Sequence, residues 1–339
     1  MTPLEQALHA ATRSGRLQGI SLATLRAGAL GEAHAVGERG AHDRRRVDEG
    51  TVFEAASLTK PLVAFIALQL AQEGRLDLDT PLHELCGAYV PDDPRARRIT
   101  GRHVLTHTSG LPNVVGPQTP FRTCFEPGER FSYGSSAFGW LQRAMEQASG
   151  RPLQQLARER VFQPLRMQRS SLTWHERFDD NHARGREWHG EPAPQRRLGR
   201  AQASWSLLTT AGDYIRFVRA TLQGYGLAPD VHARWLAPAV PARADGDPQD
   251  LPGERPPSTT IAWGLGWGLE PAQGCFFHWG HCPGFRAFVL AHRASGNAVV
   301  WLANAARGLR LAHDVLPLAV PGPHPSVAWL QIGRLADAD

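Results

Sequence analysis

Stretches with the hydrophobic pattern of β-strands occur near both ends of the chain. They are rich in β-branched, aromatic and other large apolar residues, and turn-forming residues separate them. These predicted strands comprise residues 19–26, 32–37, 263–269, 286–292 and 298–304. The first two are joined by a short glycine-containing turn, which is typical of an antiparallel pair.

Apolar positions with helical spacing mark the segments between these strands, and the N-terminal residues 1–10 have the pattern of an amphipathic helix. The longer predicted helices comprise residues 57–74, 137–149 and 211–222. Glycines at or just after their ends, at positions 74, 150 and 224, suit the left-handed conformation that often ends a helix. Residues 175–200 and 237–258 lack periodicity and are predicted to be loops.

Because strands occur at both ends without strict alternation of strand and helix, the pattern favours the α+β class. We expect a mainly antiparallel sheet flanked by helices, with an inserted helical subdomain. Residues 1–75 and 205–339 would form an α/β sandwich subdomain, and residues 76–204 the helical insertion.

Composition excludes several classes of function. No apolar run approaches the ~20 residues needed to cross a bilayer, and the N-terminus lacks the basic start and apolar stretch of a secretory signal. We therefore expect a cytoplasmic protein with no membrane partner. The net charge is +5, but 32 acidic residues are interleaved with the arginines, so nucleic acid is not an expected partner either. The sequence leaves the oligomeric state open.

The cysteines and histidines do not favour a metal site, and no cofactor is expected. The cysteines, which predict neither a disulfide framework nor a zinc site, are Cys86, Cys124, Cys275 and Cys282. His103 and His107 are spaced i, i+4, but no glutamate lies between them as in H-E-x-x-H, so we interpret them as structural. A polar loop holds a further group, which is unlike a metal motif: His175, His182 and His189.

One lysine stands out. Lysine and arginine together number 37, and Lys60 is the single lysine. Arginine keeps its proton near neutral pH, whereas a buried lysine can lose it. A lone lysine in such a chain indicates a position that needs a neutral amine, although an accident of composition is the alternative.

Ser57 precedes this lysine by three residues, in the sequence Ser57-Leu-Thr-Lys60 at the start of a predicted helix. This spacing lets the amine reach the hydroxyl. A serine hydroxyl is a poor nucleophile until a base takes its proton, and a lysine of lowered pKa can be that base. Ser57 is therefore the candidate nucleophile and Lys60 its candidate base.

Two further elements could complete this site. Tyr133 and Ser135 lie in Tyr133-Gly-Ser135, and Tyr133 could move protons if a cationic Lys60 lowers its pKa; the alternative is an ordinary loop tyrosine. His278 and Gly280 lie in His278-Trp-Gly280-His281 on a predicted strand, where glycine often marks close approach by a ligand. The alternative for His278 is a strand histidine with a packing partner.

Taken together and in this order, these elements resemble the serine β-lactamase-like and penicillin-binding-protein-like superfamily. Its members include the class C β-lactamases, the DD-peptidases and the family VIII carboxylesterases, which use S-x-x-K, then Tyr-x-Asn or Tyr-x-Ser, then Lys-Thr-Gly or His-x-Gly. Other stretches are similar too, among them residues 105–112, 127–133 and 280–285. The resemblance spans roughly residues 15–310.

The resemblance implies roles for these residues. Ser57 would form an acyl-enzyme, while Lys60 and Tyr133 would move protons in acylation and deacylation. The backbone N–H groups of Ser57 and His281 would form the oxyanion hole. Gly280 and the side chains of Ser135 and His278 would contact substrate.

Four positions bear on the substrate. Ser135 stands where the lactamases and peptidases usually carry asparagine. His278 replaces a lysine with a group that we expect to titrate near neutrality. Trp205 replaces part of a glycine pair common in the family and could narrow the cleft, and Arg286 is a candidate ligand for a substrate carboxylate.

These features favour a carboxylesterase or transesterase acting on a small acyl substrate through a Ser57 acyl-enzyme. The expected partner is a small-molecule ester or amide. A β-lactamase or a D-amino-acid amidase or peptidase is an alternative within the same chemistry. A catalytically idle relative that serves as a binding module is an alternative of another class.

Overall fold

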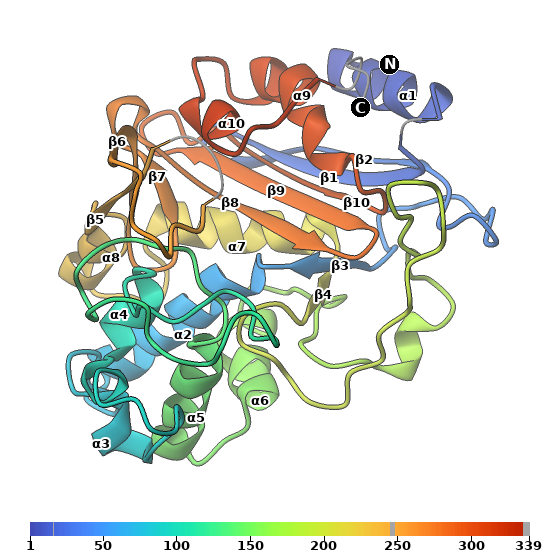
Figure 1. The fold of residues 1–339 in the computed structure, drawn as a ribbon. Coiled ribbons are helices and arrows are strands. Elements are labelled where there is room, and N and C mark those ends of the chain that lie inside the picture. The colour runs from blue at the N-terminus through green and yellow to red at the C-terminus, as the bar shows by residue number, and fades with distance from the viewer. Residues whose placement is uncertain (16, 245–247, 335–339) are drawn as a thin grey trace.

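One eight-stranded antiparallel sheet forms the centre of the molecule (Figure 1). The computed structural model describes residues 1–15, 17–244 and 248–334. In spatial order the strands are β2 (Ala29–Gly37), β1 (Gly19–Arg26), β10 (Ala298–Ala303), β9 (Phe285–His292), β8 (Cys275–Cys282), β7 (Gly268–Glu270), β6 (Pro257–Trp263) and β5 (Val240–Arg243). A second, two-stranded sheet pairs β3 (Phe53–Ala56) with β4 (Leu207–Thr209). The α+β prediction, with a mainly antiparallel sheet, is confirmed.

Helices cover both faces of the large sheet. Helices α1 (Pro3–Arg13), α9 (Ala312–Ala319) and α10 (Pro325–Trp329) pack on one face, at the top of Figure 1. On the other face lie α2 (Thr59–Gln72) and α7 (Ala211–Gln223). The remaining helices are α3 (Leu82–Cys86), α4 (Gly101–Leu105), α5 (Phe138–Ser149), α6 (Leu153–Ala157) and α8 (Pro229–Trp235).

Burial of both sheet faces explains the sequence of the central strands. In β10, Val300 and Leu302 pack in the core that α2 and α7 share, whereas Val299 and Trp301 pack under α1 and α9. Successive side chains of a strand point to opposite faces. Every residue of β10 is therefore buried, and the strand reads as a continuous apolar run.

Glycines in the sequence correctly predicted where two of the longer helices end. Helix α5 ends at Gly150 and α7 at Gly224, both with φ of 66°, in the left-handed conformation that glycine adopts at little cost. Helix α2 is buried around most of its circumference, from Thr59 to Leu70, because it lies at the centre of the larger core. Among the described residues, no helix is long and apolar enough to span a membrane.

Two sequence predictions about the C-terminal half were wrong. Residues 237–258, predicted as a loop, contain β5 and the start of β6. The predicted single strand 263–269 instead holds the last residue of β6, a turn, and the first two residues of β7. Glycines that alternate with large apolar residues imitate the period of a strand here, but Gly266 has φ of 93° and the Gly264 N–H donates to the Trp267 carbonyl over 2.8 Å.

Candidate active site

Ser57 lies in the tight turn that joins β3 to α2. Strand β3 ends at Ala56, whose φ of 48° falls in the left-handed region, and α2 begins at Thr59. The Thr59 hydroxyl donates to the Ala56 carbonyl over 2.6 Å, and the Leu207 N–H donates to that hydroxyl over 3.0 Å. These bonds fix the turn. The sequence placed Ser57 in the helix itself, whereas the structure places it two residues before the first helical residue.

Lys60 brings an amine to the Ser57 hydroxyl from the first turn of α2. Its Nζ lies 3.0 Å from Ser57 Oγ and donates to the Ser204 carbonyl over 3.0 Å. The Lys60 side chain is fully buried, and burial lowers its pKa well below the ordinary value. A neutral amine can accept the proton of Ser57, so this geometry has what a lysine base requires.

Tyr133 faces the same pair from the loop before α5. The Lys60 Nζ lies 4.9 Å from the centre of the Tyr133 ring. Burial raises the pKa of Tyr133 well above its ordinary value, although the nearby Ser57 hydroxyl lowers it in part. The idea that Lys60 lowers this pKa was therefore wrong, because burial of the phenol, which disfavours its charged form, is the largest effect. Tyr133 is a neutral phenol, and its buried hydroxyl makes no hydrogen bond of ordinary geometry within the described part of the chain.

His107 holds Tyr133 in position, and the sequence assigned it no more than a structural role. Its carbonyl accepts the Ser132 N–H over 2.9 Å, and its Nδ1 accepts the Gly134 N–H over 3.1 Å. Its ring centre lies 4.3 Å from that of Tyr133. His107 thus fixes the backbone on both sides of Tyr133. No motif of metal or catalytic type pointed to this contact.

His278, Gly280 and His281 lie in the part of strand β8 that extends beyond its pairing with β7. Pairing with β7 ends at Phe277, so beyond it β8 is paired with β9 alone. A Cβ on Gly280 would overlap the Ala55 carbonyl oxygen of β3, so only glycine lets β8 approach the Ser57 turn this closely. The arrangement brings His281 to the wall of the same cleft as Ser57.

His278 is buried behind the cleft rather than exposed within it. Its Nδ1 lies 2.9 Å from both the N–H nitrogen and the carbonyl oxygen of Trp279, and its Nε2 has no hydrogen-bond partner among the described residues. Burial first, and then the neighbouring Lys60, lower the pKa of His278 to about 3. The expectation that His278 titrates near neutrality was therefore wrong, because a fully buried imidazole beside an amine disfavours the charged form.

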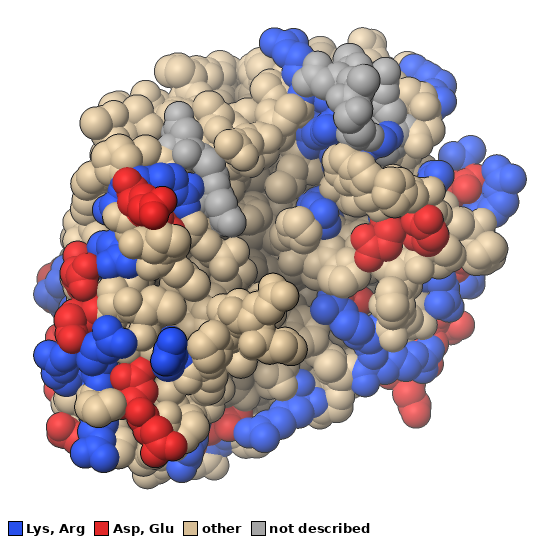
Figure 2. All heavy atoms as spheres, viewed as in Figure 1, with Lys and Arg blue, Asp and Glu red and all other residues tan. Residues whose placement is uncertain are grey.

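The cleft at these residues has a volume of about 800 Å³. Of the predicted site residues, the structure places these along its wall: Ser57, Tyr133, Ser135, Trp205 and His281. Exposed Val114 and Val115 extend the wall with apolar surface. Figure 2 shows the hollow at the centre of this face bordered mostly by uncharged residues.

Arg196 is the one charged side chain among the described residues that line the cleft, and the sequence did not single it out. Its guanidinium lies 4.6 Å from the Trp205 ring centre and forms an ion pair with Glu54. Cys282 Sγ lies 3.8 Å from the Glu54 carboxylate. The charge of Arg196 is therefore already matched, and Trp205 covers it.

Other predicted residues lie away from this wall. Arg286 donates to the carbonyls of Cys282 and Phe285 over 2.9 and 2.8 Å, so its guanidinium is satisfied by the backbone and is not placed in the cleft. His103 caps α4, where its Nδ1 accepts the Thr100 N–H. His182 contacts the Phe178 carbonyl and Gln195, and the loop histidines near it form no group of metal ligands among the described residues.

Comparison with known proteins places this geometry in a family. Residues 4–319 match the model of the Beta-lactamase family. The chain is 29% identical to penicillin-binding protein 4 of Amycolatopsis lactamdurans over 263 residues, which cover 70% of this chain and 66% of that protein. The matches span about half to two thirds of the length of the first curated relatives.

Solved structures agree at the level of the fold. One is EstCE1, a hydrolase with promiscuous acyltransferase activity, which matches at a TM-score of 0.75 and 21% identity over 90% of this chain and 94% of its own. A class C beta-lactamase matches at a TM-score of 0.75 and 18% identity over 95% of this chain and 96% of its own. The family match over nearly the whole chain shows that the chain belongs to the Beta-lactamase family.

Proposed function

We propose that this chain is a carboxylesterase or transesterase that acts on small acyl esters through an acyl-enzyme on Ser57. The observation that carries the proposal is the 3.0 Å contact between Ser57 Oγ and a fully buried Lys60 amine of lowered pKa. Intact catalytic geometry of this kind argues against an idle binding module.

Each step of the proposed reaction can be assigned to particular residues. Ser57 Oγ attacks the carbonyl carbon of the ester while its proton moves to Lys60 Nζ. The resulting oxyanion accepts hydrogen bonds from the backbone N–H groups of Ser57 and His281. The leaving alkoxide takes a proton from the neutral Tyr133 hydroxyl, which Lys60 reprotonates. Water or an alcohol then attacks the acyl carbon while the same groups take its proton. The bond from that carbon to Ser57 Oγ breaks, and the proton passes to Oγ, which restores the serine hydroxyl.

The cleft favours esters over substrates with a carboxylate. Its wall is mostly uncharged, and its one described cation, Arg196, is paired with Glu54. A β-lactam or peptide carboxylate would find no free partner among these residues, and a buried or half-buried charge without a partner is costly.

A β-lactamase or D-amino-acid amidase remains the second candidate. Arg196 favours it in one respect, because its guanidinium lies on the cleft wall and could bind a substrate carboxylate if it left Glu54. The likeness to a penicillin-binding protein adds to this candidate.

Intact-protein mass spectrometry tests the proposal. The chain is mixed with short-chain p-nitrophenyl esters, with and without an acceptor alcohol, and separately with a β-lactam, beside Ser57→Ala. We expect fast ester turnover, an acyl adduct that Ser57→Ala does not form, and only a slow β-lactam adduct. Efficient β-lactam hydrolysis would transfer the assignment to the second candidate, and an equal ester adduct on Ser57→Ala would remove Ser57 from the mechanism.

Trp205 is expected to limit the size of the acyl group. Its indole lies on the cleft wall against Arg196, so Trp205→Ala should widen the cleft and raise kcat/KM for bulky acyl esters relative to acetate esters, by about 10-fold as a typical effect of reshaping an apolar pocket. Steady-state kinetics across a series of acyl lengths checks this. An unchanged ratio would mean that Trp205 does not contact the acyl group.

The division of the chain into two subdomains also remains a proposal. In it, residues 1–75 and 205–339 carry the sheet with Ser57 and His281, and residues 76–204 contribute Tyr133 and Arg196. The cleft would then lie between the two.

A further inference from the structure

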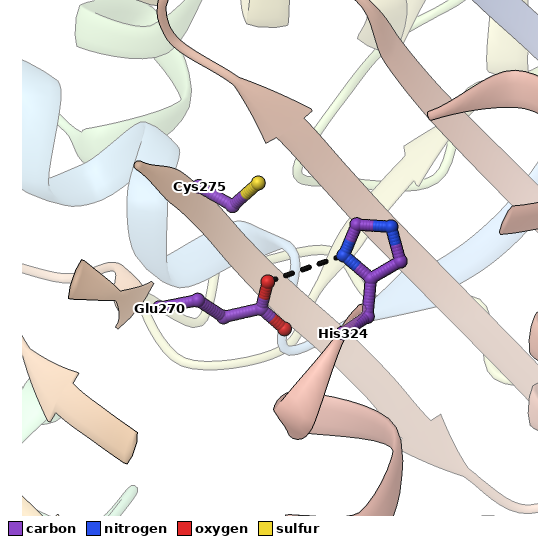
Figure 3. A group of neighbouring side chains, drawn as sticks. All are labelled: Glu270, Cys275 and His324. Atoms are coloured by element: carbon purple, nitrogen blue, oxygen red, sulfur yellow. Dashed lines mark hydrogen bonds and ion pairs between the residues drawn. The ribbon is translucent and has the colours of Figure 1, made fainter. Parts of the chain in front are cut away.

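Three side chains with metal-binding atoms meet at the end of β8 that lies away from the cleft (Figure 3). Glu270 ends β7, Cys275 begins β8, and His324 immediately precedes α10. A carboxylate oxygen, a thiol sulfur and an imidazole nitrogen from these residues all lie within 4.8 Å of one another. The length of β8 separates this cluster from His281 by roughly 20 Å, so it is distinct from the proposed active site.

Elements far apart in the sequence hold the three groups in place. Glu270 and Cys275 are direct cross-strand partners in the β7–β8 ladder. His324 reaches them from the C-terminal segment, and its Nδ1 lies 3.2 Å from Glu270 Oε2. The spacing in sequence is wide and irregular, which is why no metal motif was visible there.

The groups around the cluster orient its ligand atoms. The Nε2–H of His324 donates to the Val320 carbonyl over 2.6 Å, so Nδ1 is the nitrogen turned toward Glu270 and Cys275. The Ser326 N–H donates to Glu270 Oε1 over 3.0 Å, which leaves Oε2 facing the other two groups. Metal ligands in proteins are commonly held in this way, by a backbone partner on the far side of the ligand atom.

The side chains of the cluster are largely buried. The Glu270 side chain is 0% exposed and that of His324 is 6% exposed, and Cys275 is buried beside them. The Ser326 hydroxyl, which is also buried, has no hydrogen-bond partner among the residues that the structure describes. Among the described residues, no lysine or arginine pairs with the Glu270 carboxylate.

We propose that Glu270, Cys275 and His324 bind a zinc ion. Imidazole nitrogen, thiolate sulfur and carboxylate oxygen are the ligands that zinc takes in proteins, at about 2.0–2.3 Å. The ion displaces the Nδ1 proton of His324 and the thiol proton of Cys275, so two protons are released for each ion bound. Small movements close the three groups around the ion, and water completes a tetrahedral set.

The bound ion would join the β7–β8 hairpin to the segment that leads into α10. Its role is therefore structural, and it is independent of the proposed esterase activity at the other end of β8. Loss of zinc would loosen the C-terminal helices from the sheet without removing Ser57, Lys60 or Tyr133 from their places.

Metal retention tests the site directly. The whole chain is stripped with a chelator, incubated with Zn²⁺, desalted and analysed for zinc by elemental mass spectrometry, and the experiment is repeated with Co²⁺ to record the thiolate-to-cobalt absorption band. We expect about one zinc per chain, a cobalt band, and one sulfur at about 2.3 Å by X-ray absorption. No retained zinc, or zinc with no sulfur ligand, overturns the proposal.

Variants separate this site from other thiols and histidines. Cys275→Ser and His324→Gln should each lose most of the retained zinc, and Cys275→Ser should lose the cobalt band. Cys86→Ser is the matched control, because Cys86 is a buried thiol in α3 whose partners are the Leu82 and Trp140 carbonyls, and it should retain zinc fully. Full retention by Cys275→Ser and His324→Gln would also contradict the proposal, whatever the esterase assay shows.

Discussion

Lys60→Arg is expected to lower kcat/KM for a short-chain ester by at least the 10²–10⁴-fold that general base catalysis typically contributes, as an order of magnitude. Arginine keeps its positive charge at any working pH and cannot take the proton of Ser57. In the native chain the Lys60 amine is fully buried, its pKa is lowered, and its Nζ lies 3.0 Å from Ser57 Oγ. Steady-state kinetics with a p-nitrophenyl ester measures the effect, and activity near the native level would exclude Lys60 as the base.

A second variant separates loss of the base from loss of the fold. Arginine would place a permanent charge in a fully buried position, which is costly. Lys60→Met removes the amine without adding a charge, so it should keep the native circular dichroism spectrum and lose activity to the same extent.

The pH dependence of the native enzyme follows from the same lowered pKa. Since the neutral amine is the active form, kcat/KM should rise with pH through a pKa well below that of an ordinary lysine. His278 should contribute no step near neutrality, because its pKa is about 3. A profile that rises only at the pKa of an exposed lysine would contradict a neutral Lys60.

Gly280→Ala is expected to damage both stability and turnover. The added Cβ would overlap the Ala55 carbonyl oxygen, and backbone cannot move aside as a flexible side chain can. Overpacking of this kind typically costs about 1–3 kcal/mol of unfolding free energy. Because β8 must shift, the His281 N–H would leave the place that we propose for it in the oxyanion hole, and loss of one oxyanion donor typically lowers kcat by about 10²–10³-fold.

Gly199→Ala provides the control for Gly280→Ala. A Cβ at Gly199 would meet no atom within 4 Å, and its φ is not positive, so this variant should unfold at the same denaturant concentration as the native chain. Chemical denaturation and ester kinetics are measured on both variants. If Gly280→Ala matched Gly199→Ala in both, β8 would not lie against β3 as closely as the structure has it.

Residue patterns predicted those parts of the fold that depend on neighbours a few positions apart. Strand β1 has the predicted bounds, and α7 ends at the glycine that was expected to stop it. The pattern failed within residues 263–269, where a turn interrupts the predicted strand between the end of β6 and the start of β7. It also gave no sign of β3, a short strand that exists through its pairing with the distant β4.

The sequence by itself determined the candidate chemistry: a single lysine three residues after Ser57, followed in order by Tyr133 and by His278 and Gly280 on a strand. Such spacing is local, so it survives in the linear chain. Only the tertiary structure decided the protonation states of these groups and their interaction partners, because burial and contacts between distant segments determine both. It makes Tyr133 and His278 neutral, turns Arg286 toward backbone carbonyls, and pairs Arg196 with Glu54 in the cleft.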